Sequence, residues 1–184
     1  MPQTFLALAA IGILTFLSLQ QGRHAMRTQT EKVDIEVTTM ATQVGIDRLN
    51  EMRLLAFDEA TKANRILSSS ELSTLLPLPS DPEHLFDSLQ VRRDAHGTGP
   101  DVADDDLDDF DAVTNTVSRT TRLDTLQFSV DSVVGYVQDI SAGTASTSPT
   151  RLKQVSIRVT ALGVQPAVSV TLSQLFSCGS RCDW

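Results

Sequence analysis

The feature that most constrains this chain is an uncharged apolar run near its N-terminus. Residues 5–19 read FLALAAIGILTFLSL and contain no charged side chain. As an α-helix this run would be about 22 Å long, and its polar flanks bring it close to the roughly 30 Å core of a bilayer. Pro2 falls in the first turn, where a helix tolerates proline. The sequence therefore predicts an apolar helical segment over residues 2–21, which lipid or other protein must surround.

The helical pattern continues beyond the apolar run. Proline is absent from residues 20–66, and we expect one helix to extend to about residue 66. Such a helix would be about 95 Å long, so part of it must pack on something else. The expected domains are a helical part, 1–66, and a remainder, 67–184. Apolar residues at helical spacing support the continuation: Val33, Val37, Met40 and Val44.

Several interpretations of the apolar run stay open. A cleaved signal peptide is disfavoured, because a basic n-region and a clear A-x-A cleavage site are missing. The run is then either a plain membrane anchor or a hydrophobic helix that leaves the bilayer and packs against copies of itself.

The last third of the chain changes to a period of two. Residues 68–123 are rich in Pro, Gly, Asp and Ser and predict loops. Apolar and polar residues then alternate around Phe128, Ile157 and Val170, with turn signals between them. This pattern predicts three or four antiparallel strands. The expected fold class is α+β, with the C-terminal half of a long N-terminal helix packed on a small antiparallel sheet.

Charge and cysteine usage exclude several classes of function. The net charge is −8, and the acid is concentrated between residues 101 and 111. A basic stripe with aromatic residues is missing, so we expect no binding of nucleic acid. We also expect no enzymatic activity, because the sequence has no GxSxG, HExxH, P-loop or GxGxxG motif. The cysteines, Cys178 and Cys182, are either a local disulfide or two free thiols.

The aspartate-rich stretch supports two interpretations. Asp104, Asp106 and Asp108 have the one-three-five spacing that begins an EF-hand calcium loop, but Asp109 and Asn115 stand where that loop has glycine and glutamate. The stretch is either a calcium site of another geometry or a solvated acidic loop. The candidate ligands are Asp104, Asp105, Asp106, Asp108 and Asp109.

The layout of long helix, acidic loop region and closing sheet resembles the type IV pilins and pseudopilins. The resemblance covers nearly the whole chain as a pattern, although the chain has no family leader motif before Phe5 and no acidic residue before Glu31. Pseudopilins bind calcium in a loop near the sheet, so calcium is the one candidate cofactor. Three segments carry the resemblance besides the apolar run: ATQVGIDRLNEMRLLAFDEAT at 41–61, DDDLDDFDAVTNTV at 104–117 and RLKQVSIRVTALGVQPAVSVTLSQLFS at 151–177.

The resemblance implies a structural subunit of an extracellular type IV pilus-like filament. The partners would be further copies in a helical homopolymer, the inner membrane before assembly, and the pilus assembly machinery. The location would be the cell membrane and then the cell surface. The alternatives are a minor pseudopilin of a secretion machine and a single-pass anchored envelope domain that binds a partner. The expected polymerisation residues are Phe5, Leu6, Ala9, Ala10, Ile13, Leu14, Phe16 and Leu17.

Overall fold

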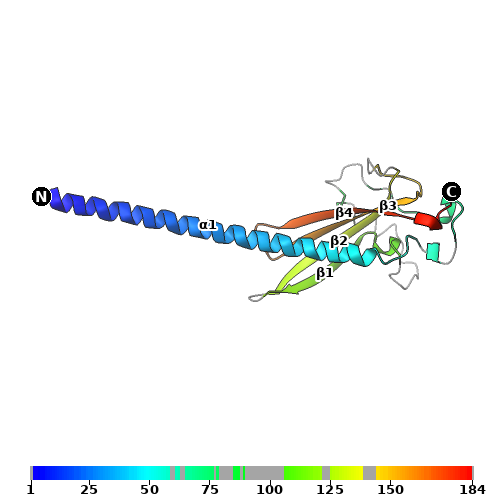
Figure 1. The fold of residues 1–184 in the computed structure, drawn as a ribbon, viewed down its shortest axis with the longest axis horizontal. Coiled ribbons are helices and arrows are strands. Elements are labelled where there is room, and N and C mark those ends of the chain that lie inside the picture. The colour runs from blue at the N-terminus through cyan, green and yellow to red at the C-terminus, as the bar shows by residue number, and fades with distance from the viewer. Residues whose placement is uncertain are drawn as a thin grey trace. The chain divides into compact units, whose positions relative to one another are not determined.

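The chain is an α+β fold in which one long helix precedes a four-stranded antiparallel sheet (Figure 1). The computed structural model describes residues 2–58, 61–62, 65–76, 78, 85–87, 89, 106–121, 125–138 and 144–183, with the side chains of residues 2–11 left out. The main elements are α1 (Pro2–Met52), β1 (Val113–Thr120), β2 (Thr125–Tyr136), β3 (Leu152–Leu162) and β4 (Ser169–Ser177). Short 3-10 helices are η1 (Ser69–Glu71), η3 (Asp108–Phe110) and η4 (Gly179–Arg181).

The chain forms two compact units, Met1–Thr39 and Met40–Trp184. The boundary lies inside α1 and not near residue 66, where the sequence placed it. The second unit contains the last turns of α1 together with the sheet, and we call it the head.

The prediction that the helix continues to about residue 66 is wrong, because α1 ends at Met52. The N–H groups of Leu54 and Leu55 donate to carbonyl oxygens only three residues back, at 3.1 and 3.2 Å, so the chain tightens into 3-10 turns. Ala56 then forms a parallel bridge with Asp106. The apolar spacing after Met52 therefore reflects burial within the head and not a further helical turn.

The strands form one meander in the order β1-β2-β3-β4, with each neighbouring pair antiparallel. The sequence predicted β2, β3 and β4 but missed β1, which lies in the region expected to be irregular. β1 is an edge strand with mostly exposed side chains, and VTNTVSRT contains only two valines. Its period-two signal is weak because backbone pairing with β2, rather than its own burial, holds it in place.

The last turns of α1 lie against one face of the sheet (Figure 1). A Cβ on Gly45 would lie 2.7 Å from Leu172 Cδ1 and 3.4 Å from Val159 Cγ2, so the helix backbone approaches β3 and β4 closely there. Asp47 on the same stretch of helix accepts a hydrogen bond from Arg119 Nη2 of β1 at 2.5 Å. The absence of a side chain at Gly45 therefore allows α1 to pack closely against β3 and β4.

The opposite face of the sheet is covered by a second apolar cluster. Side chains alternate between the two faces of a strand, so Val134 and Tyr136 lie on one face and Val133 on the other, and all three are buried. Burial on both faces explains why residues 133–137, VVGYV, form a nearly continuous apolar run. The buried members of the cluster are Leu78, Leu85, Phe86, Val133 and Val137.

Replacing Gly135 by alanine tests how tightly this second cluster closes on β2. The added Cβ would lie 2.5 Å from Leu78 Cγ and 2.8 Å from its Cδ2. We expect the free energy of unfolding to fall by about 1–3 kcal/mol, because the contact is overpacked. Denaturant titration of the full chain, followed by circular dichroism, measures it.

The matched control is Gly22→Ala, because a Cβ at that helical position meets nothing within 4 Å. Alanine is also the better helix former, so this variant should be as stable as the parent or slightly more. Equal stability of the Gly135→Ala and Gly22→Ala variants would contradict the described packing.

Candidate functional site

The first candidate site is the N-terminal part of α1, where apolar side chains are exposed. We call residues 12–19 the apolar segment. Its large side chains, Ile13, Leu14, Phe16, Leu17 and Leu19, are 51–66% exposed. All residues from 12 to 33 are exposed as well. Apolar surface of this extent normally contacts lipid or protein.

The structure describes only the backbone of the other predicted polymerisation residues, which belong to α1. These residues are Phe5, Leu6, Ala9 and Ala10. Where side chains are described, no helix is long and apolar enough to cross a membrane.

The second candidate site is a lysine buried in the head, near the start of β3. Lys153 lies on β3, and its side chain is 0% exposed. Its Nζ donates to the carbonyl oxygen of Phe57 at 2.6 Å and to Asp58 Oδ2 at 3.2 Å. It also forms an ion pair with Asp108 Oδ1. These oxygens replace the water that a buried ammonium loses.

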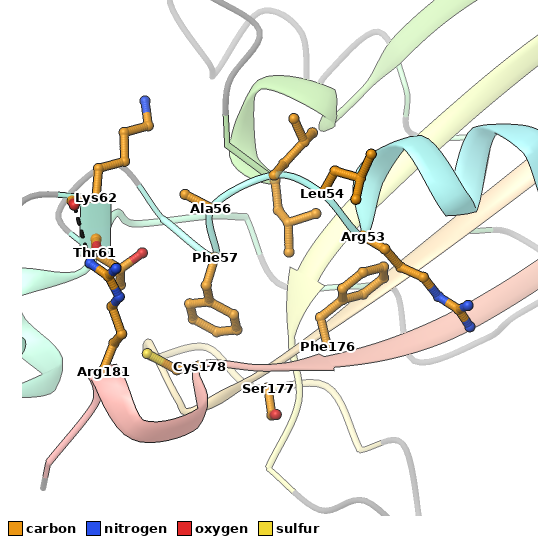
Figure 2. Close-up of a pocket in the computed structure, with 12 residues that line it drawn as sticks. Arg53, Leu54, Ala56, Phe57, Thr61, Lys62, Phe176, Ser177, Cys178 and Arg181 are labelled. Atoms are coloured by element: carbon orange, nitrogen blue, oxygen red, sulfur yellow. Dashed lines mark hydrogen bonds between the residues drawn. The ribbon is translucent and has the colours of Figure 1, made fainter.

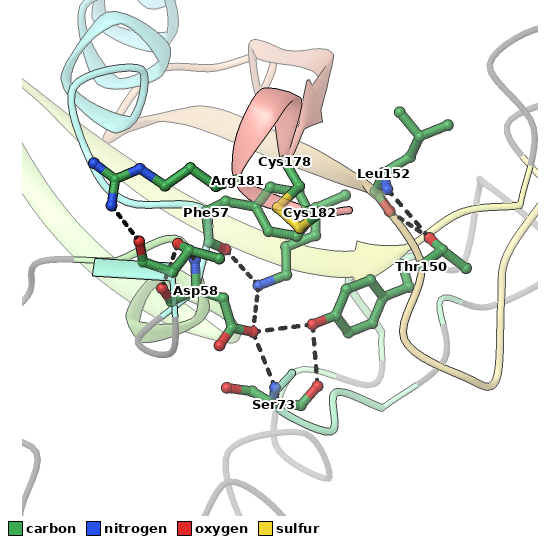
Figure 3. Close-up of a disulfide and its surroundings, with 11 residues drawn as sticks. Phe57, Asp58, Ser73, Thr150, Leu152, Cys178, Arg181 and Cys182 are labelled. Carbon is green, nitrogen blue, oxygen red and sulfur yellow. Dashed lines mark hydrogen bonds and ion pairs between the residues drawn. A yellow bond between two sulfur atoms is a disulfide. The ribbon is translucent and has the colours of Figure 1, made fainter. Parts of the chain in front are cut away.

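A further layer of contacts holds the carboxylate of Asp58 (Figure 3). The backbone N–H of Ser73 donates to Asp58 Oδ2 at 2.9 Å, and the hydroxyl of Tyr136 donates to the same oxygen at 3.1 Å. The rings of Phe57 and Tyr136 have centroids 4.6 and 5.0 Å from Lys153 Nζ, which adds cation–π attraction. We call Lys153, Asp58, Asp108 and Tyr136 the lysine cluster.

Burial dominates the electrostatics of the lysine cluster. It raises the pKa of Asp108 to about 7, although the Lys153 ammonium acts in the opposite direction. Burial also raises the pKa of Tyr136, and the carboxylates of Asp108 and Asp58 raise it further, so the phenol stays a donor. Asp108 Oδ2 is buried and has no hydrogen-bond partner among the described residues.

The described part of the aspartate-rich stretch forms a tight turn. Asp106 Oδ1 accepts from the backbone N–H groups of Asp108 at 2.8 Å and Asp109 at 3.3 Å. Asp109 Oδ2 accepts from the N–H of Asp106 at 3.1 Å, which closes the turn reciprocally. Burial raises the pKa of Asp106. These carboxylates are thus engaged with protein donors.

The calcium site stays a prediction. Asp104 and Asp105 lie outside the described residues. Among the residues that are described, no group of three or more His, Cys, Asp or Glu side chains could hold a metal ion. Asp108 is turned toward Lys153, so the described carboxylates do not converge on one point.

Near the C-terminus, Cys178 and Cys182 are joined by a disulfide, with Cα atoms 5.7 Å apart (Figure 3). The turn that it closes holds the segment that follows α1. Arg181 Nη1 donates to the carbonyl oxygens of Thr61 at 2.8 Å and Lys62 at 3.1 Å. Ile66 forms a parallel bridge with Cys182. The disulfide therefore lies where the C-terminal segment contacts residues 61–66, which follow α1.

A pocket of about 390 Å³ opens beside this disulfide (Figure 2). Cys178 is the one sequence-predicted site residue in its lining. The walls combine apolar and cationic side chains: Leu54, Phe57, Phe176, Arg53, Lys62 and Arg181.

Sequence reasoning missed the lysine cluster, although one signal was present. Lys153 has the same period-two parity as three buried residues of β3: Val155, Ile157 and Val159. A lysine in register with a buried face must have buried partners. Those partners could not be identified, because Asp58 and Asp108 are 95 and 45 residues away in the chain.

Comparisons with protein-family models, with curated proteins and with solved structures find no match for this chain. The functional argument therefore rests on the residues and contacts described above.

Replacing Lys153 by methionine tests the energetic weight of the lysine cluster. The change leaves the buried carboxylates of Asp58 and Asp108 without their cation. We expect the free energy of unfolding to fall by about 3–5 kcal/mol, measured by denaturant titration of the full chain.

Arg119→Met is the matched control, because its ion pair with Asp47 is 45% exposed on each side. A surface pair contributes about 0–1 kcal/mol. A Lys153→Met variant that loses no more stability than Arg119→Met would show that the cluster does not stabilise the head.

Proposed function

We propose that this chain is a structural subunit of an extracellular type IV pilus-like filament and that it polymerises through the N-terminal part of α1. The apolar segment is the observation that supports this most, because its large side chains are 51–66% exposed. A helix with such a surface needs lipid or further helices around it.

Filament assembly would exchange one apolar environment for another. A bilayer would hold the helix first, and copies of the same helix would then replace the lipid. Because lipid tails are as apolar as leucine, the association must draw on close packing of helices. The sequence supplies small residues that permit close approach: Ala7, Ala9, Ala10 and Gly12. A repeated contact between different surfaces produces a helical filament when its rotation does not close into a ring.

The head suits an outward position in such a filament. Both faces of the sheet are covered at its middle strands, by the last turns of α1 on one side and by the cluster around Val133 on the other. The edge strand β1 presents mostly polar, exposed side chains, which discourages edge-to-edge pairing of sheets. A net charge of −8 also favours solubility of the exposed part.

In this proposal the chain acts as a building unit and has no catalytic role. It resides in the inner membrane before assembly, where it meets the pilus assembly machinery, and it ends at the cell surface.

Negative-stain electron microscopy of material sheared from cells that express the full chain tests the proposal. Thin uniform fibres that contain the chain are the expected result. A chain that stays in the membrane fraction as a monomer, without fibres, would contradict the proposal. That outcome would favour a minor pseudopilin or an anchored binding domain.

A charge in the apolar segment should abolish the fibres. We expect Leu14→Glu to prevent polymerisation, because the carboxylate would be buried between packed helices without a partner. The matched control is Leu67→Glu in the head, since Leu14 and Leu67 are 66% and 67% exposed. Fibre yield is counted by microscopy, with the amount of each variant in the membrane fraction measured alongside. Equal fibre yields from the two variants would show that the apolar segment is not the polymerisation surface.

A further inference from the structure

The lysine cluster brings an amine and a carboxyl group together in a site that is almost entirely buried. Lys153 Nζ contacts Asp108 Oδ1, and the two side chains are 0% and 10% exposed. The second oxygen of the same carboxyl group, Asp108 Oδ2, is buried without a hydrogen-bond partner among the described residues. A simple buried ion pair would normally satisfy that oxygen.

We propose that Lys153 and Asp108 condense in the folded head into a covalent side-chain amide, with Asp58 as the group that carries the proton. This inference goes beyond the proposed filament function and does not depend on it. The site contains both reacting groups and a second carboxylate, Asp58, whose Oδ2 lies 3.2 Å from the attacking nitrogen.

The reaction balances without an added reagent. An ammonium and a carboxylate together contain all the atoms of one amide and one water. Asp58 takes a proton from Lys153 Nζ, and the nitrogen lone pair attacks Cγ of Asp108. The bond between Nζ and Cγ forms, the bond between Cγ and Oδ2 breaks, and Oδ2 leaves as water with two protons from the former ammonium, one of them delivered through Asp58. No atom is oxidised or reduced.

The contacts distinguish Asp108 from Asp58 as the reacting carboxyl group. Asp58 Oδ2 accepts from the backbone of Ser73, from Tyr136 and from Lys153, so it is held in place as an acceptor. Asp108 Oδ2 has no such donor among the described residues, and it is the oxygen that must leave. The carbonyl oxygen of Phe57 accepts from Nζ at 2.6 Å and helps to hold the nitrogen beside Cγ.

Burial also favours the product. A condensation reaction releases water, so a site that excludes water disfavours the reverse hydrolysis. The amide would join η3 to β3 across 45 residues of chain. It would enclose β1 and β2 in a covalent loop and replace two costly buried charges by one neutral group.

Mass spectrometry of the full-length protein tests the inference. After reduction of the disulfide, the parent protein should be lighter than its sequence by one water. Trypsin should release a branched peptide that joins residues 94–119 to residues 152–158, and fragmentation should place the link between Asp108 and Lys153.

Two variants separate the roles of the groups. Lys153→Arg keeps the positive charge but cannot form the amide, so it should have the full sequence mass. Asp58→Asn keeps both reacting groups and removes the proton carrier, so most of its molecules should be uncondensed. Complete condensation in Asp58→Asn would overturn the role given to Asp58.

The parent protein decides the main question even if a variant fails to fold. Parent molecules with the full sequence mass and a folded circular dichroism spectrum would overturn the inference, and so would a branched peptide linked through Asp58 or Asp106.

Discussion

The burial of the Lys153 side chain is the constraint on which the architecture of the head depends, because it enters the fold as an ammonium. An ammonium that leaves water costs several kcal/mol unless oxygen atoms replace its hydration. The carbonyl oxygen of Phe57 and the carboxylate of Asp58 lie just beyond the end of α1, so the chain must leave helical geometry after Met52 to supply them. Asp108 belongs to η3, just before β1. Lys153 therefore connects β3 to two other segments. One is the segment just after α1, and the other is η3, just before β1.

The helix meets different physical conditions along its length. Within the head, the last turns of α1 bury residues such as Ala41 and Val44, and Gly45 lets the backbone approach β4. In the first unit, residues 12–33 are exposed although several are large and apolar. Helix propensity and length are sufficient for both parts. The two parts differ in what surrounds them, because the sheet packs on the last turns of α1 and residues 12–33 are exposed. We therefore propose that lipid, and then other copies of the chain, surround the N-terminal part.

Periodicity predicted what depends on local pattern and missed what depends on distant contacts. The alternation around Ile157 and Val170 identified β3 and β4, because a half-buried strand must alternate. It missed β1, whose support comes from backbone pairing with β2. Periodicity also predicted that the helix continues past Met52, where α1 ends. Phe57 continues the helical spacing of apolar residues in the sequence, although it is buried in the head outside any helix. The lysine cluster was missed because it joins four segments of the chain, and Lys153 is 95 residues from Asp58 and 45 residues from Asp108.

The most direct test of the central claim is a helical reconstruction by cryo-electron microscopy of fibres sheared from cells that express this chain. The proposed assembly predicts a core of α1 helices packed through residues 5–19, with the four-stranded heads on the outside. Fibres whose core is built from the sheets, or preparations in which the chain forms no fibres at all, would contradict it.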